Sequence, residues 1–193
     1  MASLIETYSE GARKAFTQLG VLPDNPQLHK IKAETLRAQG KHLEAVEEWR
    51  LALAFDPRDR ATERELAASL YAGSQYLEAL NTLERLLMHD PDSTVLQFLK
   101  GDCLLQQGQA EEAIGPLTRA VSILPARASL GRALLAVGRG AEAVPHLEAP
   151  ATALDTDGAL HFQLSRAYQM AGSTDKAAAA LAESQKRRVD AQQ

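Results

Sequence analysis

The chain has 193 residues, a net charge of −4 at pH 7 and a sequence pI near 5.8. Apolar residues make up 45% and charged residues 24%, which excludes a disordered chain, and the acidic balance excludes a strongly basic nucleic-acid-binding face. The N-terminal sequence MASLIETYSE has no signal-peptide features, and no run of about 18 apolar residues occurs. We therefore expect no membrane insertion, and a cytoplasmic location is favoured.

Residues 1–25 predict a helix at the N-terminus. Apolar side chains recur there every three or four positions, which places them on one helical face, and Gly20 and Pro23 follow as stop signals. These apolar positions are Leu4, Ile5, Tyr8, Ala12, Ala15, Phe16 and Leu19. We expect this helix to cap the open end of the repeats that follow, because a repeat array needs its outer apolar face covered.

The stretch Gly40–Pro57, GKHLEAVEEWRLALAFDP, returns twice, at Ser74–Pro91 and at Gly108–Pro125, and weaker copies start further on. The sequence numbers of the equivalent alanines advance in steps of 34, 34, 30 and 34, at Ala45, Ala79, Ala113, Ala143 and Ala177. A fixed period in this range is typical of a helical repeat array. The predominance of alanine and leucine over aromatic residues also favours helix over strand.

Each repeat predicts two helices joined by a short turn, the first pair over residues 26–39 and 42–55. We predict repeats over 26–59, 60–93, 94–125, 126–157 and 158–193, the fourth being shortened and irregular. Its first helix should begin near Ala126, a turn shorter than the others, because the step to Ala143 is the short one. Pro150 should kink or end its second helix. Residues 155–158, DTDG, predict a turn and helix cap.

Small residues occupy three places in the first repeat, Ala33, Ala45 and Ala52, and bulky residues two more, Leu36 and Trp49, before the closing proline. This pattern resembles the tetratricopeptide repeat family over residues 26–190. The resemblance implies an all-α fold, a right-handed superhelical solenoid of about five helix-turn-helix repeats plus the N-terminal capping helix. We expect the superhelical pitch to change near residues 124–156.

The sequence carries no catalytic, metal-binding or cofactor-binding motif. None of the five histidines forms HExxH, and no phosphate-binding glycine pattern is present. Cys103 lies inside a predicted helix beside a small packing position, which favours a buried small hydrophobe over a nucleophile. We therefore predict a non-catalytic protein that needs neither cofactor nor metal.

The resemblance implies a concave groove lined by the first helix of each repeat. We predict a peptide-binding groove there, with residues Lys30, Arg37, Arg64, Tyr71, Phe98, Asp102, Leu105, Arg132, Phe162 and Arg166. Tyr71, Phe98 and Leu105 would be apolar anchors, while Arg132 and Arg166 would pair with an acidic part of the ligand. The alternative, in which Phe98 and Phe162 turn into the interhelical core, stays open.

The predicted function is a non-catalytic protein–protein interaction module that binds a peptide or amphipathic helix. Some relatives clamp the C-terminal carboxylate of chaperones with five residues, of which only Lys30 has a counterpart, so that ligand is excluded. The alternative is a self-associating scaffold, or a repeat segment of a larger protein. Self-association would use the apolar side of residues 176–189, at Ala177, Ala178, Ala180 and Leu181.

Overall fold

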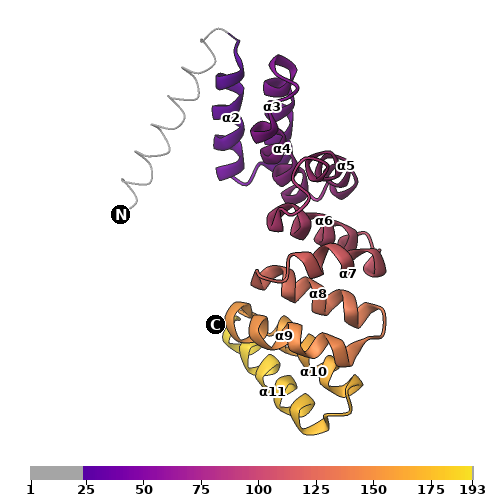
Figure 1. Ribbon diagram of the computed structural model, residues 1–193. Helices are drawn as coiled ribbons and strands as arrows, with labels where there is room; N and C mark the ends of the chain where they lie inside the picture. Colours follow the sequence, from indigo (N-terminus) through magenta and orange to yellow (C-terminus); the bar gives the residue numbers. More distant parts are fainter. Residues whose placement is uncertain (1–23, 193) are drawn as a thin grey trace, which may run out of the picture. The chain divides into compact units, whose positions relative to one another are not determined.

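The computed structural model describes residues 24–192, and these residues form helices without strands (Figure 1). The predicted all-α class is confirmed. The helices are α2 (Pro26–Ala38), α3 (His42–Phe55), α4 (Arg60–Ala72), α5 (Tyr76–Leu87), α6 (Thr94–Gln106), α7 (Ala110–Arg119), α8 (Leu124–Ala136), α9 (Gly140–Leu154), α10 (Ala159–Met170) and α11 (Thr174–Asp190). The predicted capping helix lies in residues 1–23, outside the described part.

The chain divides into two compact units, residues 1–82 and residues 83–193, here called unit 1 and unit 2. Within unit 1, α2 packs on α3 and α3 on α4. Within unit 2, each helix from α6 to α11 packs on the next, and α8 also contacts both α6 and α10. The superhelix and its pitch over the whole chain stay predictions.

The turn inside each repeat has one conformation, used five times. The backbone φ is positive at Gly40, Ser74, Gly108, Gly138 and Gly172, between 60° and 82°. The residue that follows then donates its N–H back to a carbonyl in the last turn of the preceding helix, as in Lys41 to Leu36 at 2.9 Å and Arg139 to Leu134 at 2.8 Å. This is the Schellman motif, which satisfies carbonyls at a helix end, and glycine suits its left-handed position.

Small residues bring the two helices of a repeat close together. A Cβ atom on Gly101 of α6 would lie 2.5 Å from Cγ of Leu117 on α7, and one on Gly131 of α8 would lie 2.4 Å from Cγ of Leu147 on α9. In unit 1 the buried Trp49 indole donates a 3.0 Å hydrogen bond to the Ser69 hydroxyl. Leucine thus fills the space that each small residue leaves, which gives the repeat its close packing.

The prediction that the short step of 30 residues shortens the first helix of the fourth repeat is wrong. The first helix of the fourth repeat, α8, has 13 residues, as many as α6, whereas α7 has only 10 and α3 has 14. Pro125 does not end α7 but lies in the first turn of α8, where its missing N–H costs no hydrogen bond. The residues lost relative to the first repeat therefore come from the end of α7, because the links 56–59 and 120–123 have the same length.

We predicted that Pro150 would kink or end its helix, and the helix does not end there. Helix α9 continues to Leu154 with Pro145 and Pro150 inside it. Pro150 is fully buried. Packing around this ring compensates for the backbone hydrogen bond that a proline removes, so tertiary contacts override the helix-breaking preference.

Candidate functional site

The first helices of three successive repeats, α6, α8 and α10, lie in sequence along unit 2 (Figure 1). A polar network joins the first two. The Asp102 carboxylate on α6 accepts hydrogen bonds from the Ser129 hydroxyl at 2.5 Å and from Nη2 of Arg132 at 2.8 Å, both on α8. Nη2 of Arg132 also lies 2.8 Å from Oγ of Ser129. The network fixes α8 against α6 and holds the Arg132 side chain in one place.

Asp102 and Arg132 thus differ from their predicted roles. The Asp102 side chain is buried, at 3% exposure, so it contributes to a ligand surface only through the arginine that it holds. Arg132 is 35% exposed and already bound to a carboxylate, so a ligand acid would have to share it with Asp102. The sequence placed both residues in the predicted groove and gave no signal that they pair with each other.

The predicted apolar anchors, Tyr71, Phe98 and Leu105, are partly buried. Phe98 and Leu105 are half-buried and pack against the hydrophobic core of unit 2. In unit 1, the half-buried Tyr71 ring meets the Tyr76 ring edge-on, with centroids 6.2 Å apart. For Phe98 the structure therefore favours the alternative in which its ring turns toward the interhelical core.

Helix α10 carries the most accessible part of the predicted site in unit 2. Phe162, Arg166 and Met170 are all exposed and follow one another at intervals of four residues, which places them on one helical face. Arg166 has no hydrogen-bond or ion-pair partner among residues 24–192. Met170 packs against α9, where a Cβ atom on Gly140 would lie 2.4 Å from its own Cβ. We call Phe162, Arg166 and Met170 the α10 stripe.

The cations predicted in unit 1 bind carboxylates of the next repeat. Nζ of Lys30 lies 2.6 Å from Asp59, the residue that caps α4, and its hydrogen bond lowers the pKa of that carboxyl. Arg37 on α2 lies 3.1 Å from Glu65 on α4. Arg64 is exposed on α4. Lys30 and Arg37 therefore bridge the first two repeats, and their availability to a ligand is reduced.

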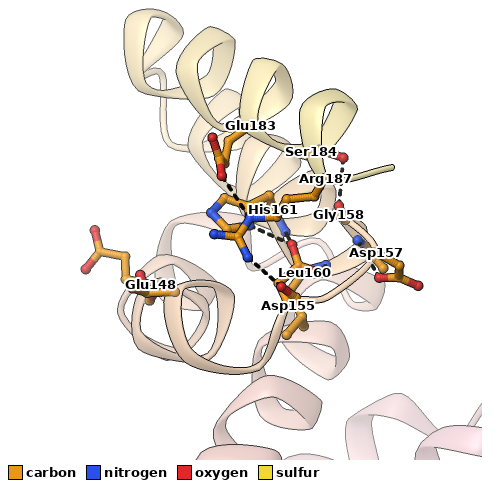
Figure 2. A network of polar contacts seen from close by, with 11 residues as sticks. Glu148, Asp155, Asp157, Gly158, Leu160, His161, Glu183, Ser184 and Arg187 are labelled. Carbon is orange, nitrogen blue, oxygen red and sulfur yellow. Dashed lines mark hydrogen bonds and ion pairs between the residues drawn. The ribbon is translucent and has the colours of Figure 1, made fainter. Parts of the chain in front are cut away.

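A second polar network, which the sequence did not predict as such, joins α9, α10 and α11 (Figure 2). The buried Asp155 carboxylate accepts hydrogen bonds from the backbone N–H groups of Leu160 and His161 at 3.2 and 2.9 Å, and Nδ1 of His161 lies 2.6 Å from it. Nη1 of Arg187 on α11 donates to the carbonyl of Asp155 at 2.5 Å. The DTDG segment is thus a helix cap, as predicted.

Helix α11 approaches this cap closely at Gly158, where a side chain would not fit. Gly158 has φ of +81°, and a Cβ atom there would lie 2.2 Å from the carbonyl oxygen of Ser184. The Ser184 hydroxyl donates a 2.7 Å hydrogen bond to the carbonyl of Gly158. Every polar atom named here bonds to another part of the chain, so this network is structural. It holds the start of α10, the helix that carries the α10 stripe, against α11.

Known proteins whose structures match this chain are built from helical repeats, in agreement with the turn that recurs in each repeat. A family model described as tetratricopeptide repeat matches residues 70–136. The matched residues run from α4 to the end of α8. No curated protein matches the chain.

Solved tetratricopeptide-repeat structures share the fold. MamA from Desulfovibrio magneticus RS-1 has a TM-score of 0.74 at 16% identity, over 88% of this chain and 98% of that one. A putative kinesin light chain with nearly identical TPR-like repeats, from Podosopora anserina, has a TM-score of 0.65 at 24% identity, over 89% and 99%. The TM-scores establish a shared architecture. At such low sequence identity, the ligand has to be inferred from the residues of this chain.

Other chemistry in the repeats is limited. Burial, and to a lesser degree the charge of Asp102, raises the pKa of the Cys103 thiol to about 12, which keeps it protonated and poorly nucleophilic. No group of three or more His, Cys, Asp or Glu side chains is arranged for a metal ion in the described residues. None of the helices between residues 24 and 192 is both long and apolar enough to cross a membrane.

Proposed function

We propose that this chain is a non-catalytic protein-binding module and that unit 2 binds an acidic peptide or amphipathic helix on its α10 stripe. Tetratricopeptide repeats and the fold that they build support a protein-interaction role. Arg166 is the feature that points to an acidic ligand, because it is exposed and unpaired within the described residues between two exposed apolar side chains.

The spacing of the α10 stripe fits a helical or extended partner. An arginine flanked by apolar side chains binds both a carboxylate and the apolar groups beside it, and arginine is enriched where binding energy concentrates. Arg132, fixed by Asp102 on the neighbouring α8, supplies a second and weaker positive site. Phe98 and Leu105 contribute mainly by supporting the floor of this face from the core.

A fluorescence-polarisation screen of acidic amphipathic peptides against the full chain tests the proposal. Arg166→Glu and Phe162→Ala should each weaken the best peptide at least about tenfold, because each removes an exposed contact. Arg188→Glu on α11 and Leu77→Ala on α5 change an exposed cation and an exposed leucine elsewhere, and should leave binding unchanged. Peptides that bind equally well to all four variants would show that the α10 stripe is not the site.

A further inference from the structure

His29 on α2 lies between two carboxylates in unit 1. Its side chain is buried, at 6% exposure. Nε2 of the ring lies 2.5 Å from Oδ1 of Asp24, which precedes α2, and Nδ1 lies 2.6 Å from Oε2 of Glu48 on α3. Within residues 24–192, neither carboxylate has another hydrogen-bond or ion-pair partner. The imidazole therefore links the entry of α2 to α3, with one carboxylate at each ring nitrogen.

Both contacts require a proton on both ring nitrogens. A neutral imidazole carries a single N–H, so its other nitrogen would turn a lone pair toward an ionised carboxylate, which can only accept. In the imidazolium both nitrogens donate, and each contact becomes a charge-assisted hydrogen bond. The observed geometry therefore fits the positively charged ring.

A histidine at the same place in the fifth repeat does not share this requirement. His161 stands four residues before the buried small residue Ser165, as His29 stands four residues before Ala33. Nδ1 of His161 lies 2.6 Å from Asp155, but its Nε2 has no carboxylate partner in the described part of the chain. A single N–H satisfies that contact, so a neutral ring keeps it. The second carboxylate is what distinguishes His29.

The charged side chains next along these helices do not replace the two carboxylates. Lys32 follows His29 by one turn on α2 and is half-buried. Glu44 precedes Glu48 by one turn on α3 and pairs with the lysine before that helix at 3.5 Å. The ring of Phe55, whose centroid lies 6.0 Å from that of the His29 ring, is uncharged. The two carboxylates are therefore the charged groups that bond to the imidazole.

We infer that His29 is a pH-sensitive latch that holds Asp24 when both ring nitrogens are protonated and releases it when the ring is neutral. The second N–H is lost as the pH rises through the range in which histidine titrates. Glu48 is 21% exposed and stays bonded, whereas Asp24 is 73% exposed and turns to water. Release frees the residue directly before Asn25, whose side chain caps α2. The latch belongs to unit 1 and does not depend on the peptide proposed for unit 2.

NMR of the histidine rings in the full chain tests the latch, because 15N shifts distinguish protonated from unprotonated ring nitrogens. His29→Gln assigns the His29 signals through their loss. At about pH 5.5 both nitrogens should carry a proton, and by about pH 8.5 only Nδ1, which faces Glu48, should keep it. Asp24→Asn removes a negative charge, so Nε2 should lose its proton at a pH lower by at least about half a unit. Asp92→Asn changes an exposed carboxylate in the link before α6 and should leave that pH unchanged.

Urea denaturation gives a second readout. A group bonded in its protonated form contributes stability at low pH that is lost as the pH rises. Between about pH 6 and pH 8.5 the folding equilibrium constant should therefore fall at least about threefold more for the unaltered chain than for Asp24→Asn. An asparagine amide at this position can donate to or accept from Nε2, so the variant keeps the contact in both forms of the ring.

Two results would overturn the inference. One is an Nε2 that loses its proton at the same pH in Asp24→Asn and in the unaltered chain, because that carboxylate would then not be bonded to the ring. The other is an equal pH dependence of stability in these two proteins, because release of Asp24 would then not be linked to the proton.

Discussion

Asp102 on α6 and Arg132 on α8 form an ion pair of 2.8 Å in which the carboxylate is buried and the guanidinium is partly open to solvent. The two residues belong to successive repeats, 30 positions apart. The next repeat places Arg166 on α10 at the same register, one full repeat step after Arg132, without a partner among the described residues. One cation therefore holds the repeats together while its counterpart remains available to a ligand.

This difference predicts that the same substitution changes stability by different amounts at the two positions. Arg132→Met should lower the free energy of unfolding by about 1–3 kcal/mol, because it leaves a buried carboxylate without its cation. Arg166→Met should change it by no more than about 0.5 kcal/mol, as expected for an exposed site. Urea denaturation followed by circular dichroism gives both values. Equal losses would contradict the structural role assigned to Arg132.

Alanine substitution of two glycines with the same backbone conformation distinguishes the cost of a steric clash from the cost of backbone strain. Gly158→Ala should destabilise the protein by more than about 2 kcal/mol, since the added Cβ would collide with the Ser184 carbonyl. Gly172→Ala should cost only about 1 kcal/mol, because φ is +75° there but nothing lies within 4 Å. Thermal denaturation of the two variants measures the difference. If they melt together, the close approach of α11 to Gly158 is incorrect.

A second pair of glycines predicts losses of stability that differ in size. Gly131→Ala should destabilise unit 2, because its Cβ would lie 2.4 Å from Cγ of Leu147. Gly115→Ala, within α7, should cost less than Gly131→Ala, since nothing outside its chain neighbours lies within 4 Å of the added Cβ. The following Pro116 disfavours the helical conformation in a residue with a Cβ and so offsets the usual gain from alanine. Chemical denaturation provides the test. A stabilising Gly131→Ala would show that α8 and α9 are further apart than described.

Asp155 predicts part of the acid sensitivity of the fold. Burial raises the pKa of this carboxyl, but the hydrogen bonds from His161 and Leu160 outweigh burial and hold the pKa below its ordinary value of 3.8. A lowered folded-state pKa stabilises the protein above pH 3.8, and that stability is lost as the pH falls through the folded-state pKa.

Asp155→Asn should therefore cost about 1–3 kcal/mol at neutral pH, and the gap from the unaltered chain should narrow in acid. Urea denaturation between neutral pH and about pH 3 measures the gap. Asp175→Asn, at an exposed carboxylate in the first turn of α11, is the control and should keep the acid dependence of the unaltered chain. A gap that stays constant with pH would exclude Asp155 as the titrating group.

The sequence predicted local structure better than contacts between repeats. Residues 42–55 were predicted as a helix and form α3 with the same bounds, because leucine, alanine and the following Asp56-Pro57 all favour that helix and that end. The five turns were equally predictable from glycine spacing, with Ser74 in the left-handed conformation at the one place without glycine.

The errors have a common physical origin in contacts between helices. From sequence alone, Pro125 and Pro150 could each stand at the end of one helix or inside a helix. Packing around them decides, and it places Pro125 in the first turn of α8 and Pro150 inside α9. Asp102 and Arg187 find their partners on neighbouring helices, which periodicity along one helix does not reveal. Phe98 lies near the border of its helical face, where a small rotation decides between groove and core.

The single tryptophan and the single cysteine fall in different units. Trp49 is buried in α3 of unit 1, and Cys103 is buried in α6 of unit 2. Indole fluorescence therefore reports the loss of structure in the N-terminal half, while trapping of the thiol by a maleimide reports opening of the C-terminal half. The natural chain thus carries its own two-channel readout of whether its halves unfold together or one after the other.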